Sequence, residues 1–334
     1  MSDVATHETA GGRRDEEVSA ALEQHRRELT AHCYRMLGSS FEAEDAVQET
    51  LIRAWRGYEG FEGRSQLRSW LYRIATNVCL DMLNARERRF RPMDLGPAGS
   101  ATGPLGEMLP EVTWVEPIPN GAVLPEDPAE VAEQRESVRM AFVAALQYLP
   151  PKQRAVLIFR EVLRWKAEEV AELLETSVQS VNSALQRARA TLAASELTDE
   201  SASAPVDEKQ RELVARYVKA FEDYDMTALT SVLHDDAMWN MPPFELWVQG
   251  PEEVVAFCMG HGIGCRGSRM IPVEGANGQP AFGQYKPAED GSGRLEPWAL
   301  QVLEITGDKL SGITFFLDTK RLFPLFGLPG RLDA

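Results

Sequence analysis

Apolar side chains recur every three or four residues over two long stretches, residues 17–91 and 131–196, and this spacing predicts amphipathic helices. One predicted helix in the first stretch has an inward face of Ala43, Val47, Leu51 and Ala54. The next repeats the pattern at Leu67, Leu71, Ile74, Val78 and Met82. Since no proline occurs in this stretch, which lies ahead of Pro92, we expect 17–91 to be helical throughout.

The second stretch predicts two further helices and then a helix-turn-helix. Residues 131–149 should form one amphipathic helix, and residues 152–163 another. Ala167–Leu174 and Val178 to about Ala193 are then separated by the turn Glu175-Thr176, and Ser177 is placed to cap the second helix. The inward stripe of that helix is Val178, Val181, Leu185, Ala188 and Leu192.

Residues 92–130 are rich in proline, glycine and acid, which predicts an extended linker. Within it lies an apolar island, Thr113–Asn120 (TWVEPIPN). A solvated spacer needs no such side chains, so we expect the island to dock on a partner or on the C-terminal domain; chance composition is the alternative.

Residues 208–334 predict an α+β domain. A long helix with Leu213, Tyr217 and Phe221 inward leads to a short helix ending at Leu233, a turn at His234–Asp236 and a strand at 237–241. A helix over Pro251–Met259 and alternating strands with a hairpin at Gly307-Asp308 follow.

Charge is distributed unevenly along the 334 residues. The net charge of −16 argues against a protein that coats nucleic acid by itself, but DNA binding needs only a local basic face. Residues 53–91 carry nine arginines against four acids, whereas 95–130 carry six acids and no base. Residues 178–192 hold two arginines and no acid. Arginine suits phosphate because its planar fork binds two oxygens.

Cysteine usage and hydropathy exclude several other classes. The four cysteines form no CxxC pair or zinc spacing, so we expect free thiols, no metal and no cofactor. Because the chain has no long apolar run and its first residues lack a signal-peptide core, we expect a cytoplasmic protein without a membrane partner.

The first helical stretch carries polar side chains that suit a partner helix and melted DNA. "DAVQETLIRAWRGYEGF" followed by "SQLRSWLYRIATNVCLDMLNARERR" resembles the second conserved region of sigma factors. The resemblance implies that Asp45, Gln48, Glu49 and Arg53 face RNA polymerase. It also implies minus-ten DNA contacts by Arg64, Arg68, Trp70, Arg73 and Asn77. Core packing is the rival interpretation for Trp55 and Trp70.

The helix-turn-helix resembles the fourth conserved region of sigma factors, which reads the minus-thirty-five element. Its base-edge candidates are Gln179, Ser180, Asn182 and Ser183, with Gln186 beside them and Arg187 and Arg189 toward phosphate. A plain three-helix core is the alternative. Both regions in this order resemble an extracytoplasmic-function sigma factor, whose partners are core RNA polymerase and promoter DNA. In that family the segment between the regions threads polymerase channels that otherwise hold nucleic acid, so the resemblance implies polymerase as the partner on which the island 113–120 could dock.

The C-terminal part resembles the SnoaL-like cone fold, and the whole resembles the sigma factors that carry such a domain. The expected fold is therefore two all-α sigma domains, 17–91 and 131–196, joined by the linker 92–130 and followed by an α+β cone domain, 208–334. An apolar ligand pocket or a filled core would be lined by Trp239, Met241, Phe244, Trp247, Phe257 and Trp298. We expect no catalytic residues: His234, Asp235, Asp236, His261 and Asp318 are the available groups.

These features predict a factor that directs promoter-specific initiation and is modulated by contact of its C-terminal domain with the sigma domains or the linker. Two other classes remain open. One is a ligand-sensing helix-turn-helix regulator that acts without polymerase, and the other is a cyclase-like enzyme fused to a DNA-binding unit. The promoter, the inducing signal, any anti-sigma partner and the sign of the modulation are not encoded in recognisable motifs.

Overall fold

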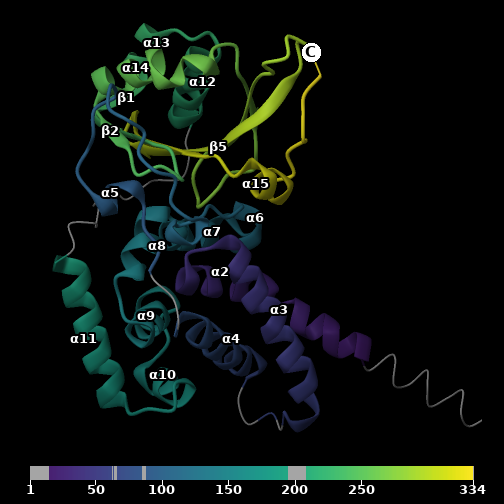
Figure 1. Cartoon of the computed structure of the whole chain (residues 1–334). Helices are drawn as coiled ribbons and strands as arrows, with labels where there is room; N and C mark the ends of the chain where they lie inside the picture. The colour runs from purple at the N-terminus through teal and green to yellow at the C-terminus, as the bar shows by residue number, and fades with distance from the viewer. Residues whose placement is uncertain (1–14, 62, 64–65, 85–87, 195–207, 334) are drawn as a thin grey trace, which may run out of the picture. The chain divides into compact units, whose positions relative to one another are not determined.

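The computed structural model describes residues 15–61, 63, 66–84, 88–194 and 208–333 (Figure 1). The chain divides into two compact units. The first holds the residues up to 88 together with 122–198, and the second holds 89–121 together with 199–334. Most of the segment between the two helical stretches therefore belongs to the same unit as the C-terminal part of the chain.

Among the residues that the structure describes, the regular structure of the first unit is helical. Its N-terminal half contains α2 (Arg26–Leu37), α3 (Ser40–Gly57), η1 (Tyr58–Gly60) and α4 (Leu67–Leu83). Its second half contains α7 (Pro128–Arg135), η3 (Glu136–Val138), α8 (Met140–Gln147), α9 (Pro151–Leu157), η4 (Ile158–Val162), α10 (Ala167–Leu173) and α11 (Val178–Ala194). The short helix α6 (Asn120–Val123) lies at the boundary of the two units.

Two buried arginines connect the halves of the first unit. The Arg35 guanidinium on α2 donates to the backbone oxygen and to Oγ of Ser137, at 3.1 and 2.7 Å. The Arg154 guanidinium on α9 donates to the backbone oxygen of Met36. Burial lowers the pKa of both guanidinium groups to about 10, which leaves them charged at neutral pH. The oxygen acceptors replace the water that these buried charges have lost.

The second helical stretch is more broken than its periodicity predicts. The single helix expected over 131–149 is wrong: α7 ends at Arg135, a 3-10 turn follows, and Arg139 adopts extended backbone (ψ 142°) before α8 begins. Further on, α9 passes into a π turn, and Arg164 has a positive φ of 57°. This irregular corner places Trp165 inside the unit, where its ring packs on Tyr72 of α4 at 5.3 Å.

The second unit is built on one six-stranded sheet with the order β2-β1-β6-β5-β4-β3. Its strands are β1 (Leu233–Asn240), β2 (Trp247–Gln249), β3 (Arg269–Pro272), β4 (Ala281–Pro287), β5 (Leu295–Thr306) and β6 (Lys309–Phe316). Only β1 and β6 pair in parallel, and the other neighbours are antiparallel. The predicted hairpin is confirmed, because Gly307 turns β5 into β6 with φ 62°.

Helices cover the sheet and enclose its core. Figure 1 shows α12 (Glu208–Glu222), α13 (Met226–Val232) and α14 (Pro251–Met259) gathered over one face. The inward residues of α12, including Leu213, Tyr217 and Phe221, are buried with strand residues such as Trp239 and Phe315. The closing helix α15 (Thr319–Leu325) packs against β5, and Phe323 contacts the ring of Tyr285 at 5.1 Å.

The turn predicted at His234–Asp236 is wrong, because these residues lie within strand β1. Its pairing with β6 shifts between Leu233 and Met238, so this part of the strand bulges. His234 Nδ1 accepts the backbone N–H of Asp236 at 3.1 Å. The His234 side chain therefore makes a turn-like hydrogen bond to the backbone inside an otherwise extended strand.

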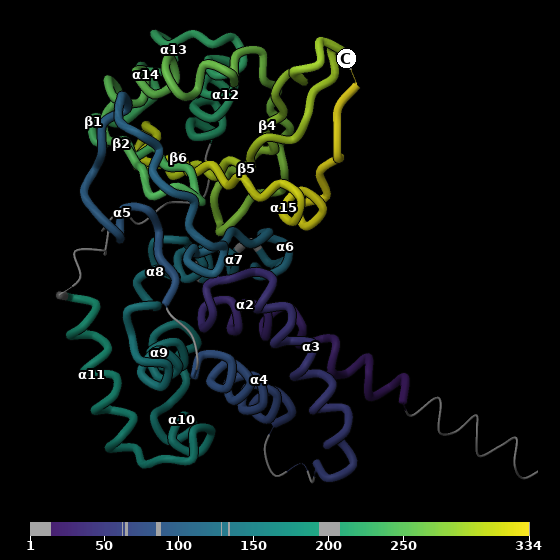
Figure 2. The backbone as a smooth tube through the Cα atoms, in the orientation of Figure 1, coloured from purple at the N-terminus to yellow at the C-terminus, as the bar shows by residue number. Residues whose placement is uncertain are grey.

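Residues 89–121 run along the second unit and are bonded to it repeatedly (Figure 2). Near its start, the backbone N–H of Gly99 donates to the Trp247 oxygen at 2.8 Å, which attaches the segment to β2. Further along, Ile118 exchanges two hydrogen bonds with Asn277, each of 3.0 Å. The α5 (Pro92–Leu95) and η2 (Glu111–Thr113) turns lie in this segment.

The apolar island is the most buried part of that segment. Trp114, Val115 and Ile118 are each at most 3% exposed. Just after the island, Asn120 Oδ1 accepts the Gly278 N–H at 2.7 Å. The Asn120 side chain also passes close to Gly275: a Cβ added to Gly275 would lie 2.5 Å from Nδ2 of Asn120. Gly275 has φ 120°, so both its backbone and this crossing require glycine.

Candidate functional site

Helix α3 presents a polar face away from the core. The Oγ of Ser39 caps the helix by accepting the Glu42 N–H at 3.2 Å. The four predicted inward residues, Ala43, Val47, Leu51 and Ala54, are buried. Of the four polymerase candidates, Asp45, Gln48 and Arg53 are exposed and Glu49 is half-buried. The Arg53 guanidinium donates to Glu49 at 2.6 Å, so these two side chains pair on the outer face.

Two apolar residues extend this outer face and were not among the predicted contacts. Ile52 is 45% exposed and Trp55 is 50% exposed. Helical spacing of three or four residues places them in line with Asp45 and Gln48. Large apolar side chains that remain half exposed commonly mark interaction surfaces. The sequence did carry a signal for them: both are apolar residues at helix positions where the neighbouring outward residues are polar. The interpretation of Trp55 as a core residue is wrong in this structure.

The minus-ten candidates on α4 are engaged within the first unit. Arg68 Nε donates to Glu28 at 2.6 Å, and its guanidinium lies over the rings of Tyr72 and Trp165 at 5.2 and 5.8 Å. Arg73 donates to the backbone oxygen of Glu172 on α10 at 3.3 Å. Two of the candidates therefore contact groups that belong to the second helical stretch.

The remaining minus-ten candidates differ in their surroundings. Trp70 is half-buried and its ring stacks on Phe61 at 5.0 Å. Asn77 is exposed. Arg64 lies outside the described residues. The described members of the set do not share one side of α4, because Arg68 and Trp70, two positions apart, point about 200° apart around the helix.

The helix-turn-helix forms as predicted. Glu175 adopts a positive φ of 51° in the turn, and Ser177 Oγ accepts the Ser180 N–H at 3.1 Å, which caps α11. Of the predicted stripe, Val181, Leu185 and Ala188 are buried, and Val178 and Leu192 are half-buried. The candidates Gln179, Ser180, Asn182, Gln186, Arg187 and Arg189 are exposed, and Ser183 is half-buried. Arg189 pairs with Glu161 at 2.5 Å.

Members of the two DNA-binding sets line the same hollow within the first unit. This hollow of about 400 Å³ is bordered by Asn77 from α4 and by Ser180 and Arg187 from α11. Lys152 and Gln153 of α9 close another side. The structure therefore brings together side chains that the sequence assigns to two separate promoter elements.

A buried histidine lies behind this contact between the two halves. His32 on α2 is hydrogen-bonded to Thr76 of α4 at 3.0 Å and packs against the ring of Phe159 at 5.1 Å. Burial, together with the nearby charge of Arg35, lowers the pKa of His32 to about 3. The imidazole is therefore neutral at ordinary pH and acts as part of the core.

Five of the six predicted pocket residues in the second unit come together. Trp239, Met241, Phe244, Trp247 and Phe257 line one space, but it has no room for a water molecule. Trp298 instead lies against Lys286, whose Nζ is 3.9 Å from the ring centre. At this place the aromatic side chains fill a core.

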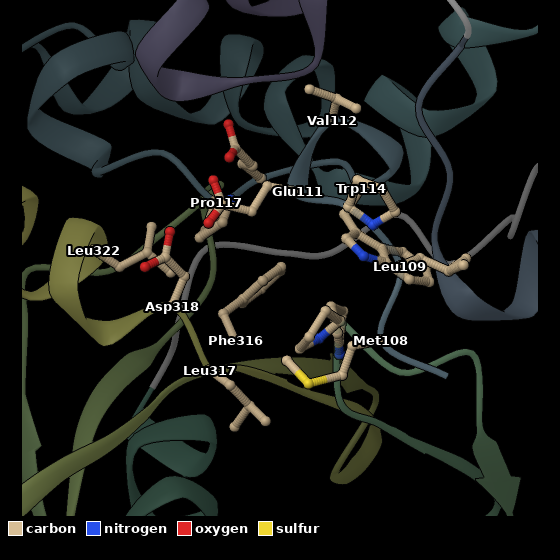
Figure 3. A pocket seen from close by; sticks show the side chains of 14 residues that line it. Met108, Leu109, Glu111, Val112, Trp114, Pro117, Phe316, Leu317, Asp318 and Leu322 are labelled. Carbon is tan, nitrogen blue, oxygen red and sulfur yellow. The ribbon is translucent and has the colours of Figure 1, made fainter. Parts of the chain in front are cut away.

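A larger cavity of about 610 Å³ lies elsewhere in the second unit (Figure 3). One wall is formed by the linker residues 108–112 with Trp114, Glu116 and Pro117. The other is formed by Pro242 and Pro243, which follow β1, by 316–318 at the end of β6, and by Leu322 of α15. The sequence could not have indicated it, because its walls are separated by more than a hundred positions along the chain.

Two of the available acid–base groups of the C-terminal domain, Asp318 and His261, have structural partners. Asp318 caps α15 by accepting the Arg321 N–H and also pairs with the Arg321 guanidinium, both at 3.4 Å. His261 Nε2 donates to the Gly103 backbone oxygen at 2.8 Å. Among the described residues, no group of three or more His, Cys, Asp or Glu is arranged to hold a metal ion. Within the same residues, no helix is long and apolar enough to cross a membrane.

Two parts of the chain match known families. Residues 21–89 match Sigma-70 region 2, and residues 139–192 match Sigma-70, region 4. Each match covers one of the two helical stretches and includes the candidate residues described above.

Relatives align over nearly the whole chain. The "ECF RNA polymerase sigma factor SigG" of Mycobacterium tuberculosis is 47% identical over 338 residues, which cover 99% of this chain and 89% of the relative. The "ECF RNA polymerase sigma factor SigW" of Bacillus subtilis is 31% identical over 48% of this chain. The crystal structure of the M. tuberculosis extracytoplasmic function sigma factor SigJ shares the fold, with a TM-score of 0.57 at 23% identity over 92% of this chain and 98% of that one.

Proposed function

Because this chain belongs to the extracytoplasmic-function sigma factors, which bind core RNA polymerase and direct initiation at specific promoters, we propose a role for each of its exposed faces. The outer face of α3, with Asp45, Gln48, Glu49 and Arg53, binds polymerase. The α4 set with Arg64 binds the minus-ten element, and the polar residues of α11 bind the minus-thirty-five element. These assignments extend the sigma-factor resemblance to individual side chains.

We infer that the first unit is in a closed arrangement. Elements centred about 25 base pairs apart are separated by about 85 Å of duplex, at about 3.4 Å per pair. Asn77 and Arg187 line one hollow of about 400 Å³, which spans only a small part of that length. The two halves must therefore separate before both elements are bound.

The C-terminal domain opposes this opening by holding residues 89–121. The observation that carries this proposal is the burial of Trp114, Val115 and Ile118 within the second unit. In the family, the corresponding segment threads polymerase channels, and one segment cannot occupy both places. Covalent attachment keeps the effective concentration high, so the docked state persists even if each contact is weak.

We propose regulation, rather than catalysis, as the task of the SnoaL-like domain, acting in the cytoplasm with polymerase. The local hydrogen bonds of His234, His261 and Asp318 support this proposal, since each group already serves the backbone or an ion pair.

The test is run-off transcription with purified core polymerase and Ile118→Ala. Truncating this side chain lowers the stability of the docked state by about 2–5 kcal/mol, because the lost packing contacts exist in that state. We expect more transcript and tighter polymerase binding than with the unmodified chain. Ile313→Ala is the matched control, because Ile313 is equally buried in the sheet of the same unit.

Equal transcript from Ile118→Ala and from the unmodified chain, with both folded, would contradict the role of the linker. If neither the full chain nor a form ending near residue 205 supports transcription on a broad promoter library, the site assignments fail as well. The ligand-sensing DNA-binding regulator would then be the better description.

A further inference from the structure

We propose that the 610 Å³ cavity of the second unit binds a small, mostly apolar aromatic molecule with a protonated amine at one end and a hydrogen-bond acceptor at the other. Its volume lies within the range of about 300–1,000 Å³ that is usual for ligand sites. Leu109, Pro242, Phe316 and Leu317 supply apolar walls. This ligand and this site go beyond the regulatory role proposed above.

One end of the cavity is acidic. Glu111, Glu116 and Asp318 all lie at the cavity, and Arg321 pairs with all three. The formal charge of these four groups is −2, and it becomes −1 when the buried Arg89 is included, whose guanidinium donates to the backbone oxygens of Glu111 and Trp114. A cation at this end is still attracted. Figure 3 shows the carboxylates of Glu111 and Asp318 on the same side of the cavity. An ammonium or amidinium group is therefore the favoured charged part of the ligand.

The opposite part of the wall offers a donor. Trp114 lines the cavity and is 3% exposed, yet its indole Nε1–H has no acceptor among the described residues. Buried donors are rarely left without a partner. This nitrogen is itself covered, so an ether or carbonyl oxygen on the ligand would accept its hydrogen by displacing the side chains that cover it. That acceptor is the ligand's second polar feature.

The mouth of the cavity is apolar and open. Met108 and Val112 line it and are 66% and 62% exposed, among the most exposed large apolar side chains in the described part of the chain. A bound ring system would cover both and remove their apolar surface from water. The exposed apolar mouth, the acidic end and the unpartnered donor point to the same class of ligand.

Binding would couple to the linker because the linker forms one wall. A ligand that needs both walls binds the docked state and shifts the equilibrium toward it. Repression of transcription by such a ligand rests on the proposed function, in which the docked state is inactive. Binding of the ligand to the cavity does not depend on that proposed function.

The binding test uses the full chain with ¹⁵N-labelled tryptophan indoles. The probe is 4-amino-6-methoxyquinoline, and 2-methoxynaphthalene serves as its uncharged analogue. We expect a saturable shift of the Trp114 indole resonance, which Trp114→Phe identifies, and binding of the amine at least about tenfold tighter than of the analogue. Glu111→Gln should weaken the amine at least about threefold and leave the analogue unchanged.

Glu107→Gln is the matched control, because Glu107 is exposed on the same segment and does not line the cavity. No shift of the Trp114 resonance with either probe at about 1 mM would overturn the site, since this limit corresponds to about −4 kcal/mol. Equal amine affinity in Glu111→Gln and in the unmodified chain would overturn the assigned charge. Saturable binding without any effect on run-off transcription would keep the site and contradict the proposed function instead.

Discussion

Helices α3 and α4 pack against each other in the first unit, yet their functional faces are in opposite states. The outer face of α3 is open, with Ile52 and Trp55 about half exposed. The candidate residues of α4 are partly covered, because Trp165 and the Glu172 oxygen contact Arg68 and Arg73, while Asn77 stays exposed. If these faces have the roles proposed above, the difference predicts an order of events: the chain binds polymerase first, and α4 reads DNA after the second half of the unit has moved away.

The largest expected effect comes from uncovering α4. Trp165→Ala should lower the free energy of unfolding of the first unit by about 3–5 kcal/mol, since this buried ring packs on Tyr72 and Phe159. Amide hydrogen exchange over 67–83 should rise, as measured by mass spectrometry. Trp298→Ala, in the second unit, is the control. Unchanged exchange at α4 would mean that Trp165 does not provide the cover.

A smaller effect should follow from acid. His32 is neutral in the folded unit because its pKa is about 3, whereas an unfolded histidine titrates near about 6.5. Below pH 6.5 the unfolded chain therefore binds a proton that the folded unit does not bind. Stability should fall as the pH drops from 6.5 toward 3, with a loss of about 2 kcal/mol at pH 5.

This pH dependence is measured by urea unfolding of the first unit at pH 7 and pH 5. His32→Gln should remove most of the difference, and His261→Gln in the second unit should retain it. A difference that survives His32→Gln would assign the acid sensitivity to other groups. If confirmed, acid weakens the contact that covers α4 without altering the outer face of α3.

The open face of α3 can be tested with a matched pair. Ile52→Asp should weaken binding to core polymerase at least about tenfold, or about 1.4 kcal/mol, because it places a charge in an apolar contact. Ile263→Asp is the control, since Ile263 is exposed to nearly the same extent, 47% against 45%. Fluorescence anisotropy with labelled chain gives both affinities. Equal weakening by the two substitutions would remove Ile52 from the proposed surface.

The smallest effect concerns an ion pair on the same face. Glu49→Gln should change the free energy of unfolding by less than about 0.5 kcal/mol, because its bond with Arg53 is exposed to solvent. Chemical denaturation measures this directly. A polymerase-binding defect in this variant would then report on recognition alone, while a large loss of stability would show that the outer face of α3 also has a structural task.

Local patterns in the sequence predicted the helical sigma domains well. The inward residues of α3, the cap at Ser177 and the buried stripe of α11 all follow from spacing and capping, which act over a few residues. The same reasoning failed at Arg139 and at His234–Asp236, where packing and strand pairing overrode local preference. It also left Trp55 undecided, because exposure depends on neighbours distant in sequence.

The sequence by itself determined the family, the order of the domains and the side chains available for recognition, since these depend on residue identity and short-range periodicity. Only the tertiary structure decided which of those side chains are covered. It also joined Trp114 and Ile118 to a sheet that begins more than a hundred residues later, and so created the cavity at Asp318. Such contacts depend on the closing of long loops around a shared core, and no local pattern encodes them.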